Sequence, residues 1–187
     1  MDEESFAYEK DDLYQTLDRI NLWIENSDTK TSIAIGAIGV VFAILLSKDY
    51  AVKFKNIIIS MINSKNFFSF LYLAVLGISI YVICKGCHYL FKVLVPRTDM
   101  NLYKESGIKV DSSIFFSTIA NTRSYKDFKK IIGKSTKAVQ RNDLISQIYI
   151  CSKICDLKFK NYKRGITLVS VGFIIFVIVI IIGLIIT

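Results

Sequence analysis

The segment CKGCH, Cys84 to His88, carries the side chains best suited to ligand chemistry in this chain. It matches the C-x-x-C-H pattern of covalent c-type haem attachment and contains the only histidine. Cys151 and Cys155 add two thiols at i, i+4 spacing, so a four-ligand zinc site is conceivable if the two segments meet. Haem or metal binding through Cys84, Cys87 and His88 is therefore one alternative. The default expectation is that these cysteines are small apolar residues near a membrane interface and that no metal is bound.

Residues that could carry out catalysis do not form a recognisable set in the sequence. There is one histidine, no Gly-rich phosphate loop, and no spacing that would pair two buried carboxylates. We therefore predict that the protein is not an enzyme, and that it has neither catalytic residues nor a resident cofactor.

Three apolar runs without a charged residue dominate the 187-residue chain: residues 31–47, 66–84 and 165–187. A helix needs roughly 17–25 residues to cross the hydrocarbon core of a bilayer, so the first run is at the short limit. In lipid every backbone N–H needs a partner within its own segment, so each run is expected to be helical. The fold class predicted is an all-α integral membrane protein with three transmembrane helices and a small helical cytosolic part.

The predicted elements follow one another along the whole chain. They are a cytosolic amphipathic helix within residues 1–30, transmembrane helix 1 in 31–47, an external connector in 48–66, transmembrane helix 2 in 67–91, a basic cytosolic helical region in 92–164, and transmembrane helix 3 in 165–187.

Apolar side chains at helical spacing define the predicted cytosolic helices. Leu13, Leu17, Ile20 and Ile24 form one stripe. A second stripe consists of Leu144, Ile148, Cys151, Cys155, Phe159 and Tyr162, and no helix breaker separates it from the third span. A continuous helix from about residue 142 to the C-terminus is therefore expected.

Two further positions mark predicted helix ends. The only proline, Pro96, is expected to end the helix of the second span. Ser27 or Asp28 is expected to cap the first membrane helix.

Charge is distributed unevenly around these runs, although the net value is +8. Residues 1–30 carry a net −6, the connector 48–66 a net +3, and residues 85–164 a net +11. The Lys/Arg bias places residues 85–164, and with them the N-terminus, in the cytoplasm of a multi-pass membrane protein. A basic surface beside a membrane suits anionic lipid head groups or a negatively charged ligand. Topology marking alone is the simpler explanation of the same charges.

The start of the first span resembles a pattern of a known family. The segment WIENSDTKTS, with Trp23, Asp28 and Lys30, resembles the W-I-x-x-A-D-x-K-A-S motif of the Pycsar transmembrane effector family. Ser27 and Thr31 replace the usual alanines.

Two segments downstream resemble the same family, in the family's order. IFFSTIANTRSYKDF, with Phe116, Ile119 and Ala120, looks like its aromatic-Gly-x-Ile-Ala segment, although a serine stands near the usual glycine. LISQIYICSKICDLKFKNYKRG, with Gln147 and Ile148, is similar to the Q-I-x-x-x-S-x-I-x-x-x-K helix that leads into the last span.

The resemblance implies an effector of bacterial anti-phage defence in the inner membrane. Such effectors respond to a cyclic nucleotide from a partner cyclase, typically a cyclic pyrimidine monophosphate, and then impair the membrane so that the infected cell stops growing or dies. A homo-oligomer is expected, with membrane lipids as partners and no nucleic acid. The basic residues best placed to bind the nucleotide phosphate are Arg123, Lys126, Lys129 and Lys130.

A second hypothesis comes from a different class of protein. The same composition fits a small constitutive membrane accessory or scaffold protein without a nucleotide response. That protein would cause no toxicity with any nucleotide.

Overall fold

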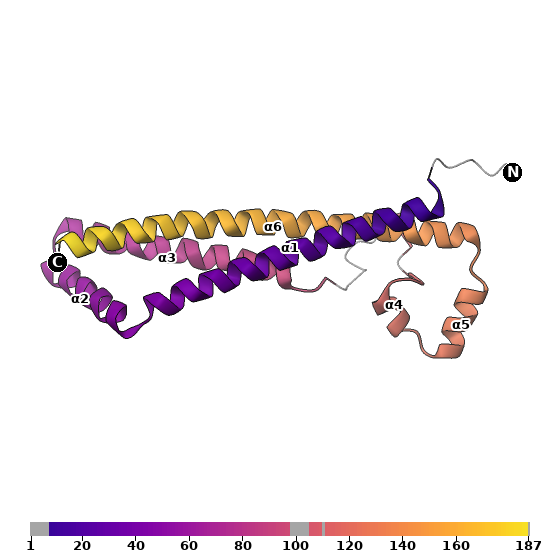
Figure 1. Cartoon of the computed structure of the whole chain (residues 1–187), viewed down its shortest axis with the longest axis horizontal. Helices are drawn as coiled ribbons and strands as arrows, with labels where there is room; N and C mark the ends of the chain where they lie inside the picture. The colour runs from indigo at the N-terminus through magenta and orange to yellow at the C-terminus, as the bar shows by residue number, and fades with distance from the viewer. Residues whose placement is uncertain (1–7, 98–104, 110, 187) are drawn as a thin grey trace. The chain divides into compact units, whose positions relative to one another are not determined.

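The structure is a computed structural model that describes residues 8–97, 105–109 and 111–186, and all regular secondary structure in these ranges is α-helical (Figure 1). The helices are α1 (Lys10–Leu45), α2 (Lys48–Ser64), α3 (Phe67–Leu94), α4 (Phe116–Ala120), α5 (Tyr125–Gly133) and α6 (Lys137–Ile186). Helices α1, α3 and α6 are long and apolar enough to cross a membrane. The predicted all-α fold with three candidate spans is confirmed.

The chain forms two compact units. The polar unit comprises Met1–Asn26 and Pro96–Leu157, and the membrane unit comprises Ser27–Val95 and Lys158–Thr187. Helices α1 and α6 contribute residues to both units without a break in either helix.

Helix α1 continues through the position where a cap was predicted. The hydroxyls of Thr31 and Ser32 donate to the carbonyl oxygens of Ser27 and Asp28, at 2.7 and 3.0 Å. The backbone there is already helical, so no free N–H groups remain for a side chain to cap. The predicted cap at Ser27 or Asp28 is therefore wrong, and the two residues lie inside one helix.

Two predicted helix limits agree with the structure. Helix α6 runs without interruption from Lys137 to Ile186, starting five residues before the predicted position. Helix α3 ends at Leu94, two residues before Pro96. Within the predicted basic region 92–164, residues 98–104 and 110 lie outside the described residues.

A small apolar core holds the polar unit together. Ile150 and Ile154 of α6 are buried against Ile24 of α1 and against Ile108 and Phe115 of the segment between α3 and α4. In the predicted stripe of α1, the residues at 13 and 20 are buried and those at 17 and 24 are half-buried. The amphipathic character predicted for this part of α1 is thus confirmed.

Close backbone contact between α3 and α6 holds the membrane unit together. A Cβ atom added to Gly86 would lie 2.7 Å from the backbone nitrogen of Val169 and 2.9 Å from the carbonyl oxygen of Gly165. On α6, Gly165 and Gly172 make similarly close approaches to α3. Small residues allow this packing in lipid, where dispersion contacts replace the hydrophobic effect between helices.

We expect Gly86→Ala to lower the free energy of unfolding by about 2 kcal/mol, because its methyl group would meet backbone rather than a movable side chain. Gly77→Ala is the control on the same helix, since a Cβ there meets nothing within 4 Å. The control should be neutral or stabilising by less than about 1 kcal/mol. Circular dichroism during unfolding in mixed detergent micelles measures both, and equal effects would contradict the packing described.

Candidate functional site

The charged residue of the first family-like motif, Asp28, pairs with a lysine that lies 130 residues away in the sequence. The Lys158 ammonium of α6 lies 2.5 Å from Oδ1 of Asp28 on α1. Lys158 is only 5% exposed, whereas the Asp28 side chain is partly exposed. A buried ammonium needs an anion and further acceptors, because removing a charge from water is costly.

The same ammonium also binds the end of α3. Lys158 Nζ donates to the carbonyl oxygen of Val93 at 2.7 Å. Val93 lies in the last turn of α3, where carbonyls have no partner within the helix and the helix dipole is negative. Lys158 therefore joins α1, α3 and α6 at one point, which we call the lysine clamp: Asp28, Val93 and Lys158.

The lysine clamp connects two of the family-like motifs. Lys158 is the final lysine of the pattern Q-I-x-x-x-S-x-I-x-x-x-K, and Asp28 is the aspartate of W-I-x-x-A-D-x-K-A-S. Sequence reasoning treated Lys158 only as a topology marker and missed the pairing. The sequence did contain a sign of this pairing. Asp28 and Lys158 carry opposite charges, each belongs to a family-like motif, and each lies a few residues before an apolar run.

The other residues of the first motif do not join this contact. Trp23 and Lys30 are exposed on α1. Ser27 and Thr31, which replace the usual alanines, are buried at 1% and 0% exposure. Small side chains at these two positions fit a face of α1 that packs inside the protein.

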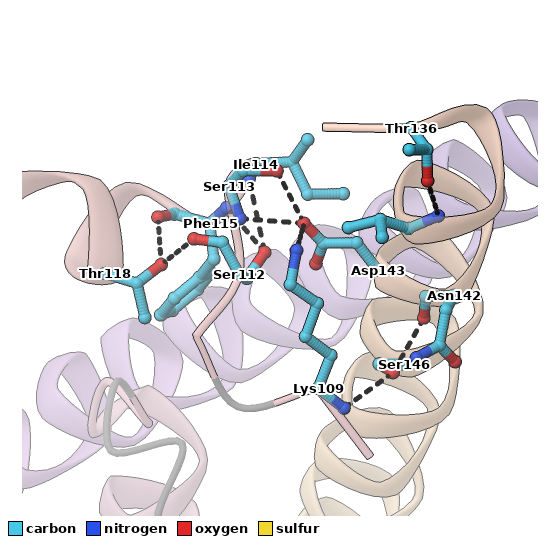
Figure 2. Close-up of polar contacts among 11 residues, drawn as sticks. Lys109, Ser112, Ser113, Ile114, Phe115, Thr118, Thr136, Asn142, Asp143 and Ser146 are labelled. Carbon is cyan, nitrogen blue, oxygen red and sulfur yellow. Dashed lines mark hydrogen bonds and ion pairs between the residues drawn. The ribbon is translucent and has the colours of Figure 1, made fainter. Parts of the chain in front are cut away.

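A second polar cluster lies in the polar unit around Asp143 of α6. Its Oδ2 atom accepts from the backbone N–H and the hydroxyl of Ser113, both at 2.7 Å, and from Lys109 Nζ at 3.3 Å (Figure 2). Ser146, one turn further along α6, accepts from the Lys109 backbone N–H at 3.0 Å. Asp143 and Ser146 thereby hold the segment before α4 against α6.

Two buried polar atoms of α6 have no hydrogen-bond partner among the described residues. They are Oδ1 of Asp143 and Nε2 of Gln147, on side chains with 1% and 3% exposure. The two residues are four apart, so they share one helix face. Gln147 belongs to the family-like motif, whereas Asp143 was not predicted. Asp143 is a carboxylate on the buried face of a helix, and a search for apolar side chains at helical spacing does not detect such a residue.

The second family-like motif forms helix α4, which Ser112 and Thr118 stabilise. The Ser112 hydroxyl oxygen accepts from the backbone N–H of Phe115 at 3.1 Å, and the Thr118 hydroxyl donates to the Ser112 carbonyl at 2.6 Å. Of the motif residues, Phe116 and Ala120 are exposed, and Ile119 is half-buried. These positions therefore shape the short helix rather than fill a core.

The predicted phosphate-binding residues lie on one exposed stretch. Arg123, Lys126, Lys129 and Lys130 are all exposed, on α5 and the turn before it. Lys130 lies 3.9 Å from Asp127, a surface pair that contributes little to stability. The Ser124 hydroxyl caps α5 by accepting from the Asp127 backbone N–H at 3.2 Å. This stretch remains a predicted site.

The cysteines and the histidine considered for haem or zinc lie on α3 and α6. In residues 8–97, 105–109 and 111–186, no three His, Cys, Asp or Glu side chains gather closely enough to hold a metal ion. Among the described residues, no disulfide joins any of the four cysteines. Burial raises the pKa of the Cys151 thiol, and the neighbouring Cys155 raises this pKa further. Cys151 therefore favours the protonated thiol, which is a poor metal ligand.

Comparison with known proteins gives one family. Residues 12–185 match the profile of the Pycsar effector protein domain. The chain is 31% identical over 177 residues to the Pycsar effector protein GmPycTM of Gulbenkiania mobilis, an alignment that covers 90% of each protein. No solved structure matches the chain significantly.

We expect Lys158→Met to lower the free energy of unfolding by about 3 kcal/mol, because it leaves the Val93 carbonyl and Asp28 without their shared partner. The double exchange D28K/K158D should not restore stability, since K158D would place a carboxylate against the Val93 carbonyl. Lys163→Met, an exposed lysine one and a half turns away, is the control. Detergent unfolding measures all three, and full rescue by the double exchange would show that the carbonyl contact does not matter.

We expect Asp143→Ala to release the segment 105–115 from α6, because three donors lose their shared acceptor. The expected loss is about 3 kcal/mol, with faster proteolysis confined to that segment. Asp111→Ala, an exposed carboxylate of the same segment, is the control. Limited proteolysis with mass spectrometry locates the cuts, and unchanged cleavage in D143A would contradict an anchoring role.

Proposed function

The chain belongs to the Pycsar effector family, and from this premise we propose that it is a membrane effector of bacterial anti-phage defence triggered by a cyclic nucleotide. The nucleotide is a cyclic pyrimidine monophosphate made by a partner cyclase during infection. The triggered effector impairs the inner membrane, and the infected cell stops growing or dies.

The continuity of α1 and α6 is the observation that best supports a triggered mechanism. Each helix has one part in the polar unit and one part in the membrane unit. In the polar unit the start of α1 packs beside the start of α6: Lys10 Nζ lies 3.1 Å from Oε1 of Gln140, and Arg141 donates to the Tyr8 carbonyl at 2.8 Å. A ligand that changes this packing acts on helices that continue into the membrane unit.

The proposed orientation places the polar unit in the cytosol, where the nucleotide is made. The excess of Lys and Arg in residues 85–164 supports this orientation. Within the membrane unit the apolar part of α1 is largely exposed, and membrane lipids and further copies of the chain are its proposed partners.

We propose that Arg123, Lys126, Lys129 and Lys130 bind the nucleotide phosphate. Their exposure and their proximity along α5 and the turn before it support this assignment, because a phosphate is bound by several charge-assisted hydrogen bonds.

We expect the charge reversal K126E/K129E/K130E to abolish toxicity when the effector is co-expressed with a pyrimidine cyclase. The exposed lysines of K134E/K137E serve as the control and should leave toxicity unchanged. Dye uptake and membrane insertion are measured in the same cells. Full toxicity of K126E/K129E/K130E would reject this phosphate site, and no dye uptake by the unmodified effector with any cyclase would reject the nucleotide-triggered function.

A further inference from the structure

The lysine clamp fixes how far α1 reaches along α6. Both helices continue from the paired residues in the direction of their C-termini, and α1 ends at Leu45, 17 residues beyond Asp28. Counting 17 residues along α6 from Lys158 reaches Ile175. Helix α6 continues for 11 residues more, about 16 Å. An apolar cleft of about 260 Å³ confirms that the end of α1 lies beside this part of α6, since Leu45 lines the cleft together with Phe173 and Phe176.

Helix α2 begins at this level and lies beside the second half of α6. The Phe54 ring of α2 is 6.3 Å from the Phe176 ring, centroid to centroid. Further along α2, Ile57 is buried against Gly183, close to the end of α6. Figure 1 shows α2 at the end of the membrane unit where α6 terminates.

The start of α2 therefore lies inside the hydrocarbon region. The third apolar run starts after Arg164, and Phe176 lies 12 residues later, about 18 Å into a core about 30 Å thick. Lys53 and Lys55 flank Phe54 and are exposed. A charged side chain near the bilayer centre costs about 2.5–3.5 kcal/mol unless water or head groups reach it.

The backbone at the same depth has an independent need for polar partners. Helix α1 stops at Leu45 and α2 starts at Lys48, with Ser47 in extended conformation and without a side-chain cap hydrogen bond. The carbonyls of Phe42 and Ile44 at the end of α1 accept from the N–H groups of Leu46 and Ser47. The first N–H groups of α2 have no partner within the helix. Leu46, at this break, is 75% exposed. In lipid each unsatisfied backbone group costs several kcal/mol, so broken helices occur where water or protein reaches them.

We propose that the first three turns of α2 form a binding surface for lipid head groups inside the membrane. The surface consists of Lys48, Asp49, Lys53 and Lys55, all exposed. Its three lysines and one aspartate favour the anionic phosphate of phospholipids. It draws head groups and water from the leaflet in which α6 ends towards the bilayer centre, and the bilayer becomes thinner there. This inference rests on the proposed membrane-impairing function and names the surface that carries it out.

Depth measurements test the position of α2 without any nucleotide. The only tryptophan is moved in two full-length variants, W23F/Y50W at the start of α2 and W23F/F67W at the start of α3. Both are reconstituted into phosphatidylethanolamine–phosphatidylglycerol vesicles containing lipids brominated near the middle of the chain. We expect stronger quenching of W23F/Y50W than of W23F/F67W. Equal quenching, or stronger quenching of W23F/F67W, would place α2 on the membrane surface and overturn the proposal.

A charge-removing variant tests what the surface does. In cells that co-express an activating cyclase, we expect K53L/K55L to reduce dye uptake at least about tenfold, because two charges no longer attract head groups. K134L/K137L removes two exposed lysines of the polar unit and should leave uptake unchanged. If K53L/K55L inserts normally and retains full uptake, the lipid-binding surface is wrong. No uptake by the unmodified effector would instead reject the proposed function, while the depth comparison would still decide where α2 lies.

Discussion

The buried ammonium of Lys158 is the constraint on which the membrane unit depends. A charge removed from water needs an opposite charge and further acceptors, and here these come from Asp28 and from the Val93 carbonyl. The partners belong to α1 and α3, so satisfying one side chain sets the position of three helices. Apolar packing alone would not do this, because lipid and side chains are equally apolar and helices can slide past one another. The glycine contacts of Gly86 and Gly165 then allow α3 and α6 to approach closely in the register that the clamp defines.

Because the lysine clamp fixes the register of α1 and α6 at one end of the membrane unit, it also determines where α1 stops beside α6 at the other end. Counted from the lysine clamp, α1 is shorter than the part of α6 beside it, and the chain must reach the start of α3 by another route. Helix α2 provides this route, with Ile57 and Met61 buried on one side and charged residues exposed on the other. The short first apolar run, which is at the lower limit for a span, is thus explained by its continuation into α2 rather than by a thin bilayer.

Features that depend on the absence of charge were predictable from sequence, and features that depend on polar partners were not. The three helices long and apolar enough to span a membrane, the uninterrupted α6 and the end of α3 before Pro96 follow from apolar runs and one helix breaker. The predicted stripe on α6 was only partly right, since residue 155 is buried but residue 159 is exposed. The most buried line runs through Asp143, Gln147, Ile150, Ile154 and Lys158, and three of these five are polar. Hydrophobic periodicity cannot find such a face, because burial there is decided by partners far away in the sequence.

The two ends of the membrane unit differ in how their polar groups find partners. The end at the lysine clamp stabilises the fold, whereas the end at the break between α1 and α2 carries the proposed action on the membrane. At the lysine clamp the buried ammonium has two protein acceptors, Oδ1 of Asp28 and the Val93 carbonyl, so its charge is satisfied within the protein. At the break between α1 and α2 the exposed lysines and the first N–H groups of α2 have no such protein partners among the residues described, although the carbonyls of Phe42 and Ile44 do. A protein selected only for stability would bury or remove these groups, since each is costly in hydrocarbon. Their retention beside the centre of α6 is understandable if the cost is borne by the bilayer, and a bilayer that moves water and head groups to meet them is no longer an intact barrier.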